Sequence, residues 1–333
     1  AIDSRLIEMR NGNLDMIHDL SPEGTFSILA EDPQVQGWFP SFPYAHPDPT
    51  LVMAVFNLQN EKFADPRVRW ALALMLDARA MSMASYRGAA TLSAISVPPT
   101  GTHPRDYHAP MQQALIDYEL DTGTSVIKPY DPEVGLQIAE MVRAQEGDVV
   151  PTDPEAIRNS FGYGWWRQNL QAAEELLTAA GYTRSGNQWM LPSGEPFTIS
   201  VVIPAEGVVN RLGTIIAQLW SQAGVQSTPE VATDIWDRTF AGSFEVEIGW
   251  AVETWGGHPD LSYFLDSYHS EYVAEPGAVQ SPRNWMRWSN PELDAKLKNM
   301  QQPTEPKSIT NNFAEGSVTM QSGSSINGDV EIS

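Results

Sequence analysis

Aromatic rings and carboxylates are interleaved in one short stretch of the chain, and these residue types together can bind a small ligand. The candidate ligand-binding residues are Trp250, Glu253, Trp255, His258 and Asp260. Flat rings supply contact area at low entropic cost, and a buried carboxylate selects for charge and orientation. Any one of these residues is more often structural than functional, so the prediction of a ligand-binding loop rests on their clustering.

The residues before this loop have the period of a β-strand. Phe244, Val246 and Ile248 alternate with Glu245 and Glu247, which predicts a strand with one buried and one polar face. Two glycines and a proline in the loop then turn the chain. The strand therefore ends where the candidate residues are presented to a ligand.

Strand and helix patterns alternate upstream of that strand. Apolar residues alternate over 197–203, a helical stripe spans about 208–223, a strand follows over 225–231, and a short helix spans 233–241. Strands and helices of these lengths predict an α/β layer. Such a layer binds ligands at the carboxyl edge of its sheet, which is where the candidate loop begins.

The first half of the chain contains clear helix signals. Asp65 followed by proline predicts the start of a helix over 65–86, and further helices are expected over 131–147 and 170–181. Residues 51–58 form a continuous apolar run of strand length, which indicates a strand covered on both faces.

Two segments are predicted to be loops. Prolines and aromatic residues without a regular period indicate loops over 21–49 and 91–110, preceded by a helix over 4–11 and a short strand over 14–18. The second loop contains three potential metal ligands, His103, Asp106 and His108. Without helix or strand spacing these residues favour a solvent-exposed loop over a metal site, and no metal is expected.

Composition excludes several classes of partner and of site. The 333 residues contain 20 Lys and Arg against 42 Asp and Glu, a formal charge of −22 that repels nucleic acid and anionic membrane surfaces. The chain contains no cysteine, so it has no disulfide, thiolate metal site or cysteine nucleophile. No apolar run approaches the length of a membrane span. The sequence starts at Ala1 with no Met and no apolar signal segment, so we expect either that a leader has been removed or that the chain is an excised piece.

Composition changes abruptly after Gln302. Residues 303–333 are rich in Ser, Asn and Gly and carry two turn signals, at Ser322–Gly323 and Asn327–Gly328. We interpret this segment as a foreign or accessory tail that is disordered or forms short β rungs.

Several stretches together resemble the family 5 extracellular solute-binding proteins of ABC importers, the receptors for peptides, nickel and oligosaccharides. The most specific is FNLQNEKFADPRVRWALALMLDARAM, residues 56–81, which is similar to the family's signature strand, turn and helix. The other stretches, in the family's order, are 86–99, 172–182 with 192–201, and 289–297. The resemblance covers about 4–300.

The resemblance implies an α/β fold, the second lobe of a periplasmic-binding-protein type II clamshell with a partial first lobe. Residues 1–58 would be the remnant of the first lobe and the crossover strand, and 59–302 the second lobe. Residues 303–333 would be the unrelated C-terminal tail. Because the long amino-terminal portion of family members and the return to the first lobe have no counterpart, the chain is expected to be a fragment.

The resemblance also implies a function, that of the substrate-binding component of an ABC transporter. Such a receptor is not an enzyme, needs no cofactor, binds no nucleic acid and is monomeric in the parent. Its partners are a small peptide or oligosaccharide and an ABC permease in the membrane. Its location is periplasmic or extracytoplasmic, with the signal peptide not present in this chain.

Within the family, the GWAVET segment resembles the motif in which an acidic residue meets the amino group of a peptide ligand. Glu253 would then be the counter-ion and Trp250 its apolar wall. Many relatives have Asp at this position, and the 11 tryptophans of the chain would suit stacking on sugar rings equally well. Peptides and oligosaccharides therefore both remain open as ligands.

Two alternatives belong to other classes of protein. A glycoside-acting enzyme could use Glu253 and Asp260 as acid and base, since two carboxylates on a loop can reach the required separation. An assembly role of the tail would follow if its rungs paired with other copies through exposed edges.

Overall fold

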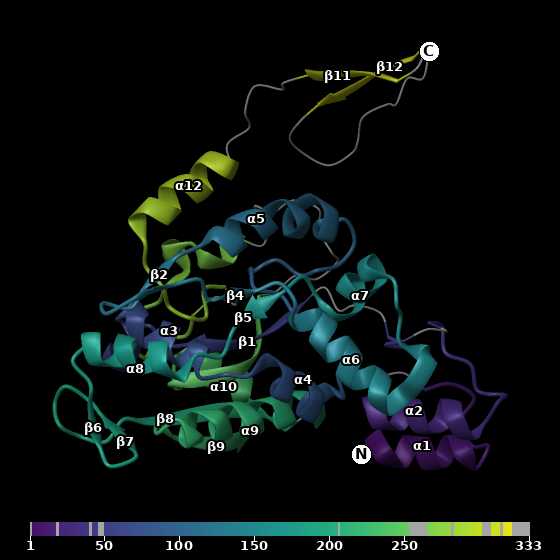
Figure 1. Cartoon of the computed structure of the whole chain (residues 1–333), viewed down its shortest axis with the longest axis horizontal. Helices are drawn as coiled ribbons and strands as arrows, with labels where there is room; N and C mark the ends of the chain where they lie inside the picture. The colour runs from purple at the N-terminus through teal and green to yellow at the C-terminus, as the bar shows by residue number, and fades with distance from the viewer. Residues whose placement is uncertain are drawn as a thin grey trace.

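A mixed four-stranded sheet is the largest sheet among the described residues (Figure 1). The computed structural model describes residues 2–17, 20–39, 42–45, 50–205, 207–252, 265–280, 283–301, 308–313 and 316–321. The order of the strands in the sheet is β1 (Leu51–Phe56), β10 (Val246–Val252), β8 (Thr198–Pro204) and β9 (Gln226–Ala232). β10 and β9 run parallel to β8, and β1 runs antiparallel to β10. The predicted α/β class is confirmed.

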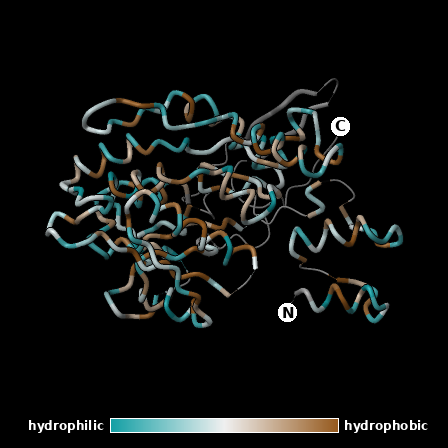
Figure 2. The backbone as a smooth tube through the Cα atoms, turned by 60° about the horizontal axis from the view of Figure 1, so that its bottom comes forward, coloured by the Kyte–Doolittle hydropathy of each residue, from teal (hydrophilic) through white to brown (hydrophobic). Residues whose placement is uncertain are grey.

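Helices account for much of the rest of the fold. In the described part of the chain they are α1 (Ile2–Arg10), α2 (Pro22–Glu31), α3 (Pro66–Leu74), α4 (Ala78–Tyr86), α5 (Ala109–Asp117), α6 (Val134–Glu146), α7 (Pro154–Phe161), α8 (Leu170–Ala179), α9 (Gly207–Gln222), α10 (Ile235–Ala241) and α12 (Pro291–Gln301). Single-turn helices are η1 (Glu61–Phe63), η2 (Pro104–His108), η3 (Gly147–Val149), η4 (Asp266–Tyr268) and η5 (Ser270–Tyr272). Figure 2 shows α1 and α2, which contact each other, at one end of the molecule.

Short strands pair outside the main sheet. The pairs are β2 (Leu120–Asp121) with β3 (Val126–Ile127), β4 (Tyr130–Asp131) with β5 (Trp165–Trp166), β6 (Thr183–Ser185) with β7 (Gln188–Met190), and β11 (Ser308–Phe313) with β12 (Gly316–Gln321). The last pair is an antiparallel hairpin within the predicted tail. Both turn signals of the tail lie outside the described residues.

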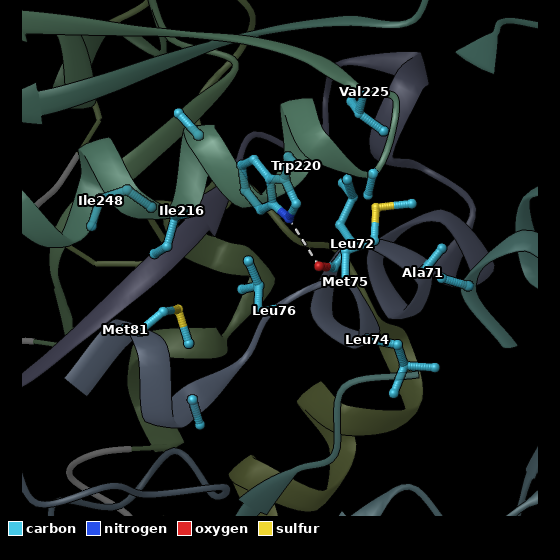
Figure 3. Close-up of a cluster of buried hydrophobic side chains, with 14 of the residues drawn as sticks. Ala71, Leu72, Leu74, Met75, Leu76, Met81, Ile216, Trp220, Val225 and Ile248 are labelled. Atoms are coloured by element: carbon cyan, nitrogen blue, oxygen red, sulfur yellow. Dashed lines mark hydrogen bonds between the residues drawn. The ribbon is translucent and has the colours of Figure 1, made fainter. Parts of the chain in front are cut away.

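The larger hydrophobic core covers one face of the sheet (Figure 3). Trp220 of α9 is fully buried there, and its indole N–H donates a hydrogen bond of 2.9 Å to the carbonyl oxygen of Leu72 in α3. Val246 and Ile248 of β10 are also fully buried in this core. The alternate residues of β10 face the other side of the sheet, where a smaller cluster contains Val55, Ile235 and Trp285.

Several helix boundaries agree with their sequence signals. The Asp65 carboxylate caps α3 by accepting a hydrogen bond of 2.8 Å from the backbone N–H of Arg67. Glycines with positive φ follow α8 and α9 at Gly181 and Gly224, as their sequence positions predict. The predicted run 51–58 also forms a strand, with Val52 and Val55 packed against the two opposite hydrophobic clusters.

The helix expected over 65–86 is two helices, so that prediction was wrong in its extent. α3 ends at Leu74, and Asp77 caps α4 by accepting hydrogen bonds from the backbone N–H groups of Arg79 at 2.9 Å and Ala80 at 3.4 Å. An aspartate inside a continuous apolar stripe favours a new N-cap over a longer helix because its side chain competes for backbone donors.

The loop expected over 21–49 contains α2. Ser21 accepts a hydrogen bond of 3.1 Å from the backbone N–H of Gly24, and proline occupies the first helical turn, so residues that resemble a loop form a capped helix start. The strand expected over 14–18 is absent from the described residues 14–17. Helix α7, capped by Asp153, had no counterpart among the predictions.

The loop expected over 91–110 contains η2 and the start of α5, and its histidines are buried rather than solvent-exposed. His103 Nδ1 lies 3.0 Å from the carbonyl oxygen of Pro98, and His108 Nε2 lies 3.0 Å from that of Val97. Asp106 instead pairs with Arg105. Each imidazole therefore bonds to a backbone carbonyl of this segment, which explains its burial.

Candidate functional site

The carboxyl end of β10 is the part of the predicted site that the structure describes. β10 is parallel to β8, so the carboxyl ends of both strands lie at the same edge of the sheet. Trp250 stands near this edge, opposite Val52 of β1, and its half-buried ring packs against the larger core. The other four predicted residues, Glu253, Trp255, His258 and Asp260, lie outside the described residues, and their roles stay predictions.

β10 also contains a carboxylate, Glu247. The sequence predicted that Glu247 lies on a polar face, and that prediction was wrong. Its side chain is buried, with 1% of the residue exposed. Its cross-strand neighbours are Val55 of β1 and Val202 of β8, both buried in the smaller cluster. β10 has a hydrogen-bonded neighbour on each side, and a strand in the middle of a covered sheet buries both faces.

The hydrogen-bonding partner of Glu247 is a buried threonine. The Thr239 hydroxyl donates to Oε2 of Glu247, and its oxygen also lies 2.8 Å from the carbonyl oxygen of Ile235. Burial raises the pKa of Glu247 to about 7, and the hydrogen bond from Thr239 opposes this rise.

Gly249 leaves space for this carboxyl group. A Cβ atom at Gly249 would lie 2.7 Å from Oε1 of Glu247. Gly249 follows Glu247 on the same face, so the carboxyl group extends toward the carboxyl end of β10. Trp250 lies on the face of β10 opposite to Glu247. The signal that could have found Glu247 is a glutamate between valine and isoleucine in a central strand.

The chain after the predicted loop is held by buried polar groups. The Asn284 amide donates to the carbonyl oxygens of His269 at 3.0 Å and Trp288 at 2.7 Å. The Asp294 carboxylate accepts from the backbone N–H of Ser270 at 3.0 Å. These bonds hold η5, the loop around Asn284 and the start of α12 together.

The part of the chain that the structure describes contains no cluster of three His, Cys, Asp or Glu side chains that could hold a metal ion. Within the same residues, no helix combines the length and the apolar character needed to cross a bilayer.

Comparison with protein families gives one match. The model described as "Bacterial extracellular solute-binding proteins, family 5 Middle" matches residues 2–274 of the chain. A search of curated proteins found no match.

Solved structures of similar fold include oligopeptide-binding proteins. A periplasmic oligopeptide-binding protein of an oligopeptide ABC transporter from Thermotoga maritima has a TM-score of 0.65 and 14% identity, covering 90% of this chain and 47% of its own. Its mannohexaose-bound structure has a TM-score of 0.57 and 15% identity, with coverages of 89% and 46%. The oligopeptide-binding protein AppA from Bacillus subtilis, in complex with a nonapeptide, has a TM-score of 0.52 and 15% identity, with coverages of 90% and 46%.

These likenesses establish the fold, and this chain spans about half the length of the solved relatives. The family match extends over most of the chain and includes α1, the sheet and the carboxyl end of β10. The chain belongs to family 5 of the bacterial extracellular solute-binding proteins.

Proposed function

We propose that this chain is part of the substrate-binding component of an ABC importer, and that the carboxyl edge of β8 and β10 forms one wall of its ligand cleft. The observation that carries the proposal is the end of β10, where Trp250 and the buried Glu247 extend from opposite faces of one strand in a chain of this family. A rigid strand that ends in a turn can hold aromatic and acidic side chains in fixed positions for a ligand.

The ligand is a small peptide or an oligosaccharide. Neighbours of similar fold include a protein solved with a nonapeptide and one solved with mannohexaose. In this proposal Glu253 pairs with the amino group of a peptide and Trp250 forms an apolar wall, with Trp255, His258 and Asp260 completing the site. The protein works in the periplasm or another extracytoplasmic space and delivers its ligand to a permease in the membrane.

The proposed division of the chain follows from the family. Residues 59–302 form the lobe that carries the site, and residues 1–58 contain the crossover strand β1 and a part of the other lobe. Residues 303–333 are an accessory tail. Affinity would come from closure of two lobes around the ligand, with no bond made or broken, so the protein is not an enzyme.

Calorimetry tests this proposal on the protein encoded by the complete reading frame that contains this chain. One panel contains di- to pentapeptides, each with a free or an acetylated amino terminus, and the other contains oligosaccharides of two to six rings. A peptide receptor binds the free peptides, and Glu253→Gln weakens that binding by roughly tenfold or more, as loss of a buried charge pair requires. An oligosaccharide receptor binds the sugars instead. In that case free and acetylated peptides give the same result, and this is also true of the Glu253→Gln variant.

Two results would contradict the proposal. The absence of heat with every member of both panels removes the receptor function in this form. Hydrolysis of an oligosaccharide that Glu253→Gln abolishes would instead support an enzyme that uses Glu253 and Asp260.

A further inference from the structure

A second hollow lies apart from the proposed ligand cleft. It has a volume of about 230 Å³ and is lined by Pro66, Arg69, Trp70, Ala73 and Trp166. The first four belong to α3 and the last to β5. None of the five belongs to β8, β10 or the predicted loop after β10. The hollow therefore shares no lining residue with the proposed ligand cleft.

Two indole rings form the apolar part of the hollow, and each is held by a further ring. Trp70 and Trp166 meet edge to face, with ring centroids 4.9 Å apart. Tyr118 stacks on Trp70 at 5.8 Å, and Tyr130 meets Trp166 edge to face at 5.9 Å. Both tryptophans are half-buried. The rings are therefore fixed in place while part of their surface remains open to a ligand.

Arg69 supplies the charge of the hollow and is also held in position. Its Nη1 group donates to the backbone carbonyl oxygens of Phe63 and Ala64, the latter at 3.0 Å. Among the described residues Arg69 makes no ion pair and no other hydrogen bond, because the nearby Asp65 carboxylate pairs with Arg67. Nε and Nη2 of Arg69 thus remain as two donors of a half-buried, positioned guanidinium.

The side chains that line this hollow offer donors and apolar surface only. Arg69 and the two indoles carry N–H groups, whereas the proline and alanine carry no polar side-chain atom. Guanidinium groups pair with carboxylates through two parallel hydrogen bonds, and indole faces pack against flat rings. The volume is below the usual range for drug-sized ligands, which limits the occupant to about one ring.

We propose that this hollow binds a small organic carboxylate carried on a single ring, with the carboxylate on Arg69 and an apolar ring face against Trp70 and Trp166. An aromatic acid and a uronic acid share this chemistry. The inference does not depend on the proposed transport function, because a ligand of the hollow touches none of the cleft residues.

The test compares each acid with its neutral counterpart by calorimetry and tryptophan fluorescence on the full chain. The probes are benzoate against benzamide and glucuronate against glucose. We expect at least one acid to bind tenfold or more tightly than its neutral counterpart, and Arg69→Gln to abolish that difference. Binding of benzoate identifies an aromatic acid as the ligand class, and binding of glucuronate identifies a sugar acid.

Matched variants separate the site from general effects of charge and folding. Arg105→Gln removes an exposed guanidinium of η2, which does not line the hollow, and is expected to leave binding unchanged. Arg69→Lys keeps the charge but loses the planar fork, so it should bind the acid at least threefold more weakly. Equal binding of acid and neutral probe, binding that survives Arg69→Gln in a folded protein, or no binding of any probe would overturn the proposal.

Discussion

The two faces of β10 differ in what they bury. One face places Val246 and Ile248 in the larger core, which also contains the Trp220 indole and its hydrogen bond to Leu72. The other face places Glu247 between Val55 and Val202, with Thr239 as its hydrogen-bonding partner. Val246, Glu247 and Ile248 are all buried, yet only Glu247 is titratable.

The first face stabilises the fold through apolar burial. On the second face, burial of the Glu247 carboxyl group costs free energy of desolvation. A hydrophobic residue of similar volume at Glu247 would avoid the desolvation of a carboxyl group. Strongly perturbed carboxyl groups that lie beside a cleft are candidates for function, because stability alone does not require them. The buried carboxyl group on the second face is therefore a candidate for function, and four changes test the contrast between the two faces.

The largest expected effect is on the first face. Trp220→Ala removes a fully buried indole and its hydrogen bond, and we expect a loss of about 3–5 kcal/mol in the free energy of unfolding. The matched control is Trp236→Ala, since 43% of Trp236 is exposed, and a loss of about 1 kcal/mol is expected there. Urea denaturation measures both, and equal losses would refute the assignment of the main core to the first face.

The second effect is a pH dependence that belongs to Glu247. Its pKa of about 7 in the folded protein is above the ordinary value of 4.5, so the unfolded chain loses this proton first as the pH rises. Stability from the protonated group is complete below pH 4.5 and is lost as the pH rises through about 7. We expect a loss of about 3 kcal/mol across this window, since each pKa unit corresponds to about 1.4 kcal/mol.

Glu247→Gln removes the titration but keeps an amide that can bond to Thr239. The variant should therefore gain stability relative to the wild type between pH 4.5 and 7.5, measured by urea denaturation at several pH values. Glu195→Gln, at an exposed position, controls for the loss of one charge. Parallel stability profiles for wild type and Glu247→Gln would show that Glu247 is not a buried acid.

The third effect concerns the contact between α9 and the first face. A Cβ atom at Gly213 would lie 2.1 Å from Cγ2 of Ile203 in β8, so Gly213→Ala forces the helix away from the sheet. We expect a loss of about 1–3 kcal/mol, partly offset by the better helix propensity of alanine. Gly207→Ala in the same helix meets no atom within 4 Å and should cost nothing. Equal melting temperatures for the two variants would contradict this close approach.

The smallest expected effect is the loss of stability on removing the ion pair of Glu245, which is partly exposed whereas Glu247 is buried. The Glu245 carboxylate is partly exposed and pairs with Nζ of Lys62, which also donates to the carbonyl oxygen of Thr198 at 2.9 Å. Lys62→Gln should cost about 1 kcal/mol or less, and the cost should fall at high salt because a partly exposed pair is screened. A cost above about 3 kcal/mol that does not respond to salt would place this pair in a dry interior.

Predictions from the sequence succeeded where a local signal has only one structural meaning. Asp65 before proline starts a helix, Gly224 ends one, and the apolar alternation at 197–203 forms β8. Predictions failed where the same residue type fits two environments. Asp77 begins a new helix inside an apolar stripe, and Ser21 with its following proline caps a helix where a loop was expected.

The sequence by itself determined the α/β class and the family, because hydrophobic period and motif order are local properties of the chain. Only the tertiary structure decided that β10 lies between two other strands, that Glu247 is buried, and that Arg69 and Trp166 line one hollow. Each of these depends on neighbours brought together from distant parts of the chain, and no local pattern specifies which face a partner will cover.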